Sequence, residues 1–223
     1  MNDFPEALFW DMDGTLVDTE PLWDDATAAF LADHGVDHSD ELRHQMVGAP
    51  GSVVIPLILQ AAGLGPEHAD QVRARIKAHV VTAFSAGVPL MPGAVGLLEE
   101  ADAKGIPQVL VTSTSPDLTD ILLESIGRRR FEHIVTPVDV DHPKPHPAPY
   151  RKAGELIGVP VTETLAIEDS ASGIRSALAA GAGVIAVPSS APLPEEHPLL
   201  RVRSLDHYRL ADLPALAYRA PAV

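Results

Sequence analysis

The stretch Ala7-Leu8-Phe9-Trp10-Asp11-Met12-Asp13-Gly14-Thr15 decides the fold. Its apolar start ends abruptly at Asp11, which is typical of a short buried strand that carries polar residues at its carboxyl end. Asp11 and Asp13 then crowd one small volume, and Gly14 allows the backbone to turn sharply. Because carboxylates held close together are costly when unpaired, a divalent cation is their natural partner. The alternative is an ordinary solvated turn.

Further apolar runs have the same character as the first one. They are residues 108–111 before Thr112, residues 133–135, residues 164–167 before Glu168, and residues 183–187 before Pro188. Helical patterns with start or stop signals lie between them, at residues 94–103, 117–126, 148–157 and 170–180. Strands that alternate with helices of this length predict an α/β fold with a Rossmann-like, doubly wound parallel sheet. In such sheets ligands gather at the carboxyl ends of the strands.

A long stretch from about residue 21 to residue 86 interrupts the alternation. It predicts helices only, at residues 22–34, 40–46, 53–62 and 67–83. We interpret it as a helical insert after the first strand, with residues 15–20 and 87–93 as linkers. The expected division is a Rossmann-like core of residues 1–15 and 90–223 and a small α-helical cap domain of residues 16–89. The tail from residue 189 is expected to pack along the core, with a last short strand near residues 202–205.

Composition excludes several classes of function. The 223 residues carry a formal net charge of −15, so the surface field repels nucleic acid and anionic membranes. The absence of cysteine excludes disulfides, thiolate catalysis and Cys-ligated zinc. An acidic N-terminus and the lack of a long apolar run favour a cytoplasmic protein without a membrane partner. Nothing in the sequence demands more than a monomer.

A second pair of acidic residues, Glu168 and Asp169, ends another apolar run. Acidic residues at the start of a helix are the alternative interpretation of this pair. Together with Asp11 and Asp13, the pair makes an oxygen-rich site with too few protein ligands for a Ca²⁺ cage. Such a site suits Mg²⁺ that is completed by water and a substrate phosphate.

Lys144 lies between prolines in the segment Asp141-His142-Pro143-Lys144-Pro145-His146-Pro147. The prolines fix the loop and prevent a helix there. A lysine held in this way can offset the repulsion between a carboxylate nucleophile and an anionic phosphate. The hydroxyl-rich run 112–115, at the end of another strand, can hold phosphate oxygens near a helix N-terminus. A plain surface lysine and an ordinary helix cap are the respective alternatives.

These motifs occur in one order along the chain: residues 11–15, then Thr112 and Ser113, then Lys144, then residues 167–170. In this order they resemble the haloacid dehalogenase-like hydrolase superfamily. The resemblance covers nearly the whole chain, and an insert after the first motif resembles the helical cap of subfamily I. The nearest likeness is to the β-phosphoglucomutase-like and sugar-phosphate phosphatase branch.

The resemblance implies a role for each matched residue. Asp11 would attack phosphorus and form an aspartyl-phosphate, and Asp13 would protonate the leaving oxygen and then activate water. Mg²⁺ would be held by Asp11, by the backbone carbonyl of Asp13 and by Asp169, with Glu168 as a ligand or as a partner of a ligand. Lys144 would neutralise charge. The phosphoryl group would be bound by the side chain of Thr112 or, alternatively, of Ser113. Backbone N–H groups of Ser113 and of the loop around Met12 to Gly14 would be additional donors.

The resemblance also separates chemistries. The dehalogenases lack the second aspartate, so Asp13 argues against a carbon–halogen substrate. A phosphonate-cleaving member would need a cap lysine as a Schiff base, and the insert holds only Lys77, which lies in a late helix. A β-phosphoglucomutase carries a cap histidine where this chain has Trp23, and a cap arginine just past the position of Gly48, where this chain has none.

The expected activity is therefore the Mg²⁺-dependent hydrolysis of a small phosphomonoester, such as a sugar phosphate. Cap contacts with that small phosphorylated metabolite are expected from Thr19, Glu20 and Trp23. A β-phosphoglucomutase-type phosphomutase is the alternative within the family. A non-catalytic binding module on the same fold is the alternative from another class, and the complete set of acidic residues with Lys144 argues against it.

Overall fold

The computed structural model describes residues 4–46, 51–187 and 202–220. A five-stranded sheet with the order β3-β2-β1-β4-β5 forms its core, and all of its strand pairs are parallel. The strands are β1 (Ala7–Trp10), β2 (Gln108–Val111), β3 (His133–Val135), β4 (Thr164–Glu168) and β5 (Gly183–Ala186). The predicted Rossmann-like, doubly wound sheet is confirmed.

The first apolar run occupies the centre of the sheet. Strand β1 pairs with β2 on one side and β4 on the other, in a register that places Trp10 beside Leu110 and Ile167. All four residues of β1 are fully buried, which explains why the run is continuously apolar. The indole N–H of Trp10 donates to the side-chain oxygen of Gln108 at 2.9 Å, so its polar atom is paired inside the core.

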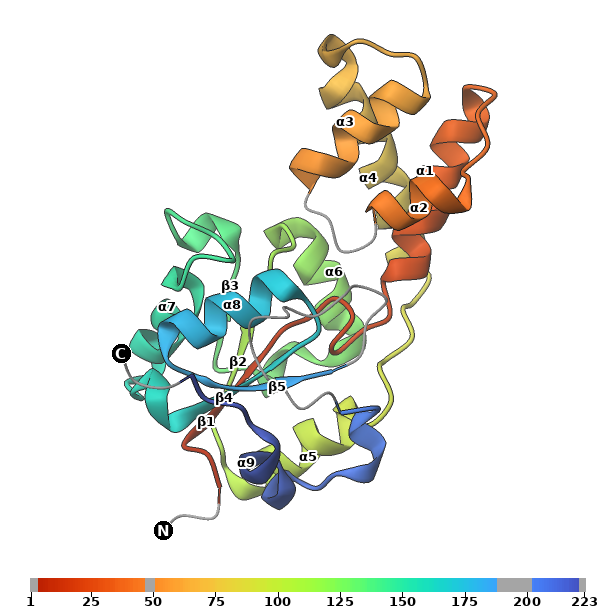
Figure 1. The fold of residues 1–223 in the computed structure, drawn as a ribbon. Coiled ribbons are helices and arrows are strands. Elements are labelled where there is room, and N and C mark those ends of the chain that lie inside the picture. The colour runs from red at the N-terminus through yellow and green to blue at the C-terminus, as the bar shows by residue number, and fades with distance from the viewer. Residues whose placement is uncertain (1–3, 47–50, 188–201, 221–223) are drawn as a thin grey trace. The chain divides into compact units, whose positions relative to one another are not determined.

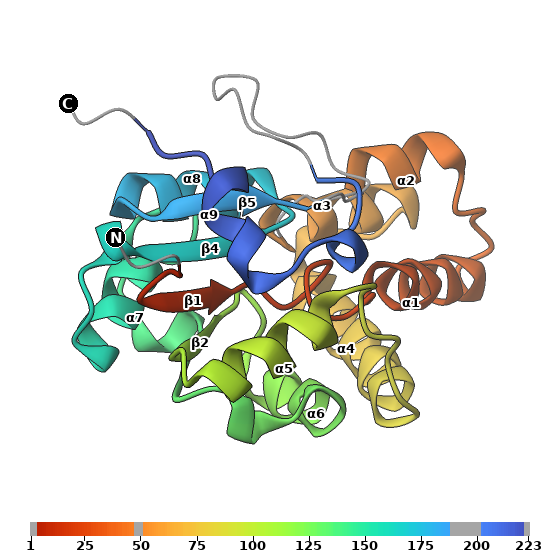
Figure 2. The same ribbon diagram turned by 90° about the horizontal axis from the view of Figure 1, so that it is seen from below.

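Helices cover both faces of the sheet (Figure 1). The helices of this part of the chain are α5 (Ala94–Lys104), α6 (Pro116–Ile126), α7 (Ala148–Ile157), α8 (Ala171–Ala180) and α9 (Leu213–Leu216). Helices α7 and α8 pack on one face, against β2–β3 and β4–β5 respectively. Helix α9 contacts β5 from the opposite side and lies near α5, in front of the sheet in Figure 2.

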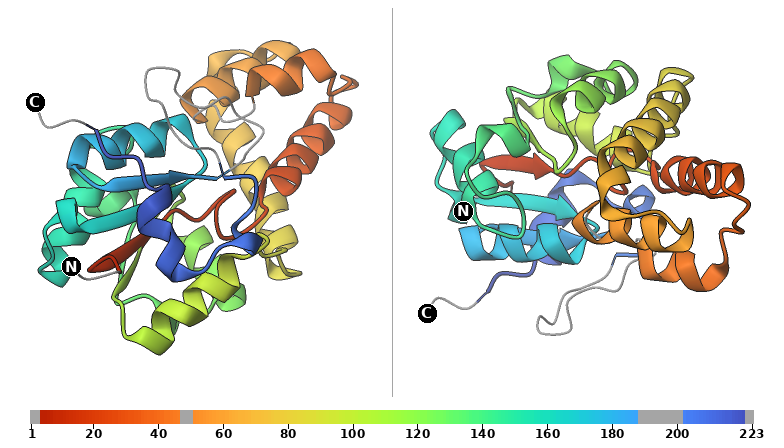
Figure 3. Two further views of the ribbon diagram at one scale, coloured as in Figure 1. Left: turned by 60° about the horizontal axis from the view of Figure 1, so that its bottom comes forward. Right: turned by 90° about the horizontal axis from the view of Figure 1, so that it is seen from above.

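The chain divides into two compact units. The first contains residues 1–18 and 89–223, and the second contains residues 19–88. The second unit is helical, with α1 (Glu20–Asp33), α2 (Asp40–Met46), α3 (Gly51–Ala61) and α4 (Ala69–Ser85). Helices α1 and α4 run side by side (Figure 3, red-orange and yellow), and α4 buries Val72, Ile76, Val80 and Phe84 at four-residue spacing along one face. The domain boundaries expected from the sequence, 1–15, 16–89 and 90–223, stay a prediction.

Single 3₁₀ turns complete the described chain: η1 (Pro66–His68), η2 (Arg128–Arg130), η3 (Pro137–Asp139), η4 (Val161–Glu163), η5 (Leu205–His207) and η6 (Leu210–Asp212). The strand expected near residues 202–205 is wrong. Val202 and Leu205 are buried, but Val202 makes one backbone hydrogen bond to Ala186 and Leu205 begins η5. Their apolar side chains fill the core, but their backbone does not form a strand of the sheet. The expected packing of residues 189–201 lies outside the described residues.

Within the described part of the chain, no helix is both long and apolar enough to cross a membrane.

Candidate active site

The carboxyl ends of β1 and β4 bring the predicted acidic residues together. Because the two strands are parallel neighbours, Asp11 follows β1 at the same edge of the sheet where Glu168 ends β4 and Asp169 follows it. All three residues are buried: Asp11 is 6% exposed, Asp169 is 7% exposed and Glu168 is 0% exposed. Residues 157 positions apart in the chain thus form one cluster of carboxylates.

Lys144 supplies the positive charge of this cluster. Its ammonium donates to Asp11 Oδ1, to Glu168 Oε1 and to the carbonyl of Val111, each at 2.7 Å. The lysine side chain is only 2% exposed. An ammonium has three N–H groups, so all of them are used within the protein. A direct contact between Lys144 and a substrate phosphate stays a prediction, and it would require the release of one of these acceptors.

Tyr150 is a residue of this network that sequence reasoning missed. Its hydroxyl donates to Glu168 Oε1 at 2.5 Å, and its ring lies 5.4 Å from the ammonium of Lys144. The tyrosine is fully buried on α7, six residues after the lysine, which is the signal that could have placed it near the site. Ser170 donates to the other oxygen of Glu168 at 3.2 Å, so both oxygens of this buried carboxylate have partners.

The side chains of this network influence each other's ionisation. Burial raises the pKa of Glu168 from its ordinary value of 4.5 to about 7, and the Asp11 carboxylate adds to the rise while Lys144 opposes it. Burial alone would lower the pKa of Lys144, but the carboxylates of Asp11 and Glu168 outweigh it and raise that pKa. Burial and Glu168 raise the pKa of the Tyr150 phenol. Lys144 therefore stays cationic, Tyr150 stays a donor, and Glu168 titrates near neutrality.

The carboxylates of Asp11, Glu168 and Asp169 fit a divalent cation. One oxygen from each residue lies within 4.8 Å of the other two. Carboxylate oxygens are the hard donors that Mg²⁺ prefers, and a small protein ligand set leaves room for water and substrate. The side chain of Asp13 does not belong to this group, so only its backbone carbonyl remains as the predicted ligand from that residue.

The loop after β1, whose backbone N–H groups are the predicted phosphate ligands, is a tight turn held by its own backbone hydrogen bonds. The carbonyl of buried Met12 accepts N–H groups from Leu16 and Val17, and the N–H of Gly14 donates to Val17 at 2.8 Å. Gly14 has a φ of +77°, and a side chain at this position would run into the carboxylate of Asp169. The Gly14 amide is thus occupied within the loop, and its contact with phosphate stays a prediction.

Thr112 and Ser113 differ in their surroundings. Thr112 is buried at the end of β2, and its hydroxyl oxygen accepts the N–H of Thr114 at 3.0 Å. Ser113 is exposed. Thr114, which sequence reasoning treated only as part of the hydroxyl-rich run, donates from its hydroxyl to Asp13 Oδ2 at 2.6 Å. The choice between Thr112 and Ser113 as phosphate ligand stays open.

The predicted cap contacts lie in the second compact unit. Thr19 is buried and immediately precedes α1, and Glu20 is the first residue of that helix. The ring of Trp23 packs edge-on against Phe84, with ring centroids 6.1 Å apart. Their contacts with a substrate stay a prediction.

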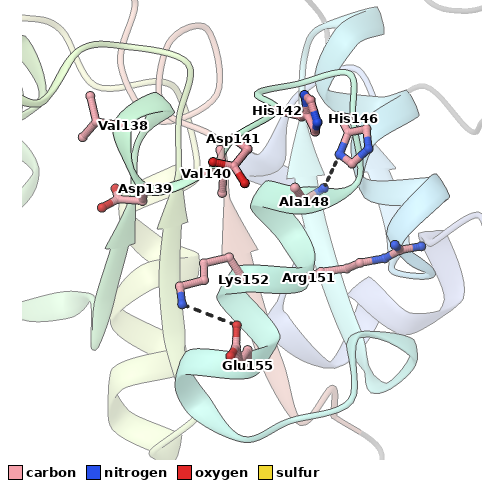
Figure 4. Close-up of a pocket in the computed structure, with 10 residues that line it drawn as sticks. All are labelled: Val138, Asp139, Val140, Asp141, His142, His146, Ala148, Arg151, Lys152 and Glu155. Atoms are coloured by element: carbon pink, nitrogen blue, oxygen red, sulfur yellow. Dashed lines mark hydrogen bonds and ion pairs between the residues drawn. The ribbon is translucent and has the colours of Figure 1, made fainter.

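A separate groove of about 700 Å³ runs between η3 and α7 (Figure 4). The residues that line it are Val138, Asp139, Val140, Asp141, His142, His146, Ala148, Arg151, Lys152 and Glu155. Lys152 pairs with Glu155, and the Nδ1 atom of His146 accepts the N–H of Ala148. None of the predicted site residues lines this groove.

Comparisons with known proteins identify the family of this chain. Residues 5–181 match the family described as haloacid dehalogenase-like hydrolase. The chain is 30% identical to the protein CbbY of Rhodobacter capsulatus, over 96% of both chains. It is 33% identical to a phosphoglycolate phosphatase of Rhodospirillum rubrum, over 81% of this chain and 78% of that one. A crystal structure of CbbY from Rhodobacter sphaeroides with xylulose-(1,5)-bisphosphate is similar, with a TM-score of 0.76 and 27% identity over 94% of this chain and 99% of that one.

The metal-free protein should become less stable as the pH rises from about 4.5 to about 7, because folding raises the pKa of Glu168 across this range. In this window the folded state keeps a proton on Glu168 that the unfolded chain has released, so a rising pH favours unfolding. The full shift corresponds to on the order of 3 kcal/mol. Urea unfolding in EDTA across this window should show that Glu168→Gln removes this part of the pH dependence.

The matched control is Glu155→Gln, because the carboxylate of Glu155 is exposed. It should leave the pH dependence as in the wild type. Equal pH slopes for the wild type and Glu168→Gln would contradict the assigned protonation.

Gly14→Ala should weaken Mg²⁺ binding by at least about tenfold, because a methyl group there displaces the Asp169 carboxylate. Gly105→Ala is the control, since Gly105 also has a positive φ (+66°) but has nothing within 4 Å of the added carbon. Both variants should lose about 1–2 kcal/mol of stability from the left-handed backbone. Isothermal titration with Mg²⁺ should separate the two variants. Equal affinities for Mg²⁺ would show that the added methyl group does not displace the Asp169 carboxylate, or that this carboxylate does not bind Mg²⁺.

Proposed function

The chain belongs to the haloacid dehalogenase-like hydrolases, and from this premise we propose that it is a Mg²⁺-dependent phosphatase that hydrolyses a small phosphomonoester through an aspartyl-phosphate. The observation that carries the proposal is the buried cluster of Asp11, Lys144, Glu168 and Asp169 at the ends of β1 and β4. The relatives support the substrate class, because one is named as a phosphoglycolate phosphatase and another was crystallised with a sugar bisphosphate.

Asp11 is the proposed nucleophile. Its Oδ1 atom accepts from Lys144, so this oxygen is held in place while the side chain remains 9% exposed. A carboxylate oxygen that attacks phosphorus forms an acyl-phosphate and splits the hydrolysis into two steps. Lys144 offsets the charge of the carboxylate during the approach of an anionic phosphate.

Asp13 is the proposed general acid and base. It lies two residues after Asp11, beyond the buried carboxylate cluster, and its Oδ2 atom is held by Thr114. In the first step it gives a proton to the leaving oxygen, and in the second step it takes a proton from the attacking water. Thr112 or Ser113 binds the transferred phosphoryl group near the start of α6.

Mg²⁺, held by Asp11, Asp169 and the Asp13 carbonyl, with Glu168 as a ligand or beside one, would neutralise charge on the phosphoryl group when bound. Glu168 also holds the ammonium group of Lys144 in place, because it accepts hydrogen bonds from both Lys144 and Tyr150. Gly173 on α8 lies against the carboxylate of Glu168, where a larger residue would not fit.

The phosphomutase of the same branch remains the second candidate, and the cap residues argue against it. Trp23 stands where such a mutase carries a histidine, and the sequence has no arginine just past Gly48, a position that lies outside the described part of the chain. β-Glucose 1-phosphate with a bisphosphate activator distinguishes the two. Rapid conversion to the 6-phosphate with little free phosphate would establish the mutase.

Asp11→Asn should lower phosphate release by at least about a thousandfold, because an amide is not a nucleophile. The assay is a phosphate-release screen over sugar phosphates, nucleotides and phosphoglycolate, with EDTA and with added Mg²⁺. Acid-quenched wild type should also gain the mass of one phosphoryl group, and Asp11→Asn should not.

The matched control is Asp37→Asn, an exposed aspartate of the second unit, which should keep the wild-type rate. Mg²⁺-dependent phosphate release by Asp11→Asn at the wild-type rate would refute the proposal.

A further inference from the structure

A hydroxyl from a different strand end holds the side chain of Asp13. Thr114 Oγ1 donates to Asp13 Oδ2 at 2.6 Å, across 101 residues of sequence. The threonine follows β2 and the aspartate follows β1, so the parallel pairing of these strands brings the two loops together. This contact belongs neither to the cation cluster of Asp11, Glu168 and Asp169 nor to the lysine network.

Thr114 is itself held at both ends of its backbone. Its N–H donates to the hydroxyl oxygen of Thr112 at 3.0 Å, and its carbonyl lies 3.3 Å from the hydroxyl of Thr119, which shares its proton with the nearer carbonyl of Ser115 at 3.0 Å. Thr112 and Thr119 are both buried, the first at the end of β2 and the second in α6. A β-branched side chain also has few χ1 rotamers, so the hydroxyl of Thr114 has a fixed place. The aspartate is thereby tied to the rigid core.

We propose that Thr114 is a positioning residue that orients Asp13 for proton transfer to the leaving group. The inference rests on the proposed function, in which Asp13 is the general acid. A hydroxyl that donates to Oδ2 favours Oδ1 as the oxygen that carries the transferable proton. Thr114 thus selects one of the two carboxyl oxygens and holds its orientation.

The step that depends on this orientation forms one bond to phosphorus and breaks another. A lone pair of the Asp11 carboxylate forms the new O–P bond, while the P–O bond to the leaving group breaks and its electron pair stays on the leaving oxygen. That oxygen takes the proton from Oδ1 of Asp13, which becomes a carboxylate. Thr114 keeps its proton throughout and donates to Oδ2 before and after the transfer.

The test compares two esters of similar size with different leaving groups, p-nitrophenyl phosphate and benzyl phosphate. p-Nitrophenolate leaves without a proton, whereas a benzyl alkoxide needs one. Thr114→Val keeps the shape of the side chain and removes the hydroxyl. We expect kcat/KM, which reports formation of the aspartyl-phosphate and not its hydrolysis, to fall by about tenfold to a hundredfold for benzyl phosphate and to stay within about twofold of wild type for p-nitrophenyl phosphate.

Conservative and remote variants complete the design. Thr114→Ser retains the hydroxyl and should restore most of the benzyl phosphate activity. Thr82→Val makes the same chemical change on an exposed face of α4 and should change neither substrate. If Thr114→Val does not fold, Thr114→Ala is used with the same expected ratio of activities.

The outcomes separate the inference from the proposed function. Equal losses of kcat/KM on both esters in the Thr114 variants, or no loss, would overturn the positioning role. If Asp13→Asn is selective for benzyl phosphate while Thr114→Val is not, the inference fails and the acid role of Asp13 stands. If Asp13→Asn also lowers kcat/KM equally for both esters, the acid role and the inference fail together.

Discussion

The hydrogen-bonded ammonium group of Lys144 is the interaction on which the site depends. Asp11 and Glu168 are buried carboxylates that share this cation, and removing charges from water costs several kcal/mol for each ion unless they are paired and hydrogen-bonded. Lys144 meets that condition with three acceptors at 2.7 Å. Without it, the buried carboxylate of Asp11 and the carboxyl group of Glu168 would face each other with no cation between them.

The parallel sheet makes this arrangement possible. Strand β1 lies at the centre, so the loops that follow β2 and β4 flank the loop of Asp11 and Asp13 on either side. The neighbour on one side contributes Glu168 and Asp169, and the neighbour on the other contributes Thr112 and Thr114. The lysine comes from a Pro-rich loop before α7, the same helix whose Tyr150 supports Glu168. Buried acidic and hydroxyl side chains therefore meet at one edge although they are far apart in sequence.

Much of the fold could be predicted because local signals agreed with the tertiary structure. The run at residues 7–10 is continuously apolar because β1 is covered on both faces, and glycines at positions 127, 158 and 181 mark helix ends. The prediction of a strand at residues 202–205 was wrong because apolar residues such as Val202 and Leu205 can be buried without pairing in a sheet. The acidic residues and the lysine could be found as motifs. The bonds of Tyr150 and Thr114 could not, because they join residues whose proximity only the folded chain sets.

A double-mutant cycle on Lys144 and Asp11 tests the central claim most directly, through the free energy of unfolding in urea at neutral pH. Lys144→Met alone should cost about 3–5 kcal/mol, because it leaves the buried carboxylate of Asp11 without a cation and forces a proton onto Glu168. In the Asp11→Asn background the same substitution should cost clearly less, with a coupling of at least about 1 kcal/mol. Equal costs in both backgrounds would contradict the account, since Lys144 would then not stabilise the site through the charge of Asp11.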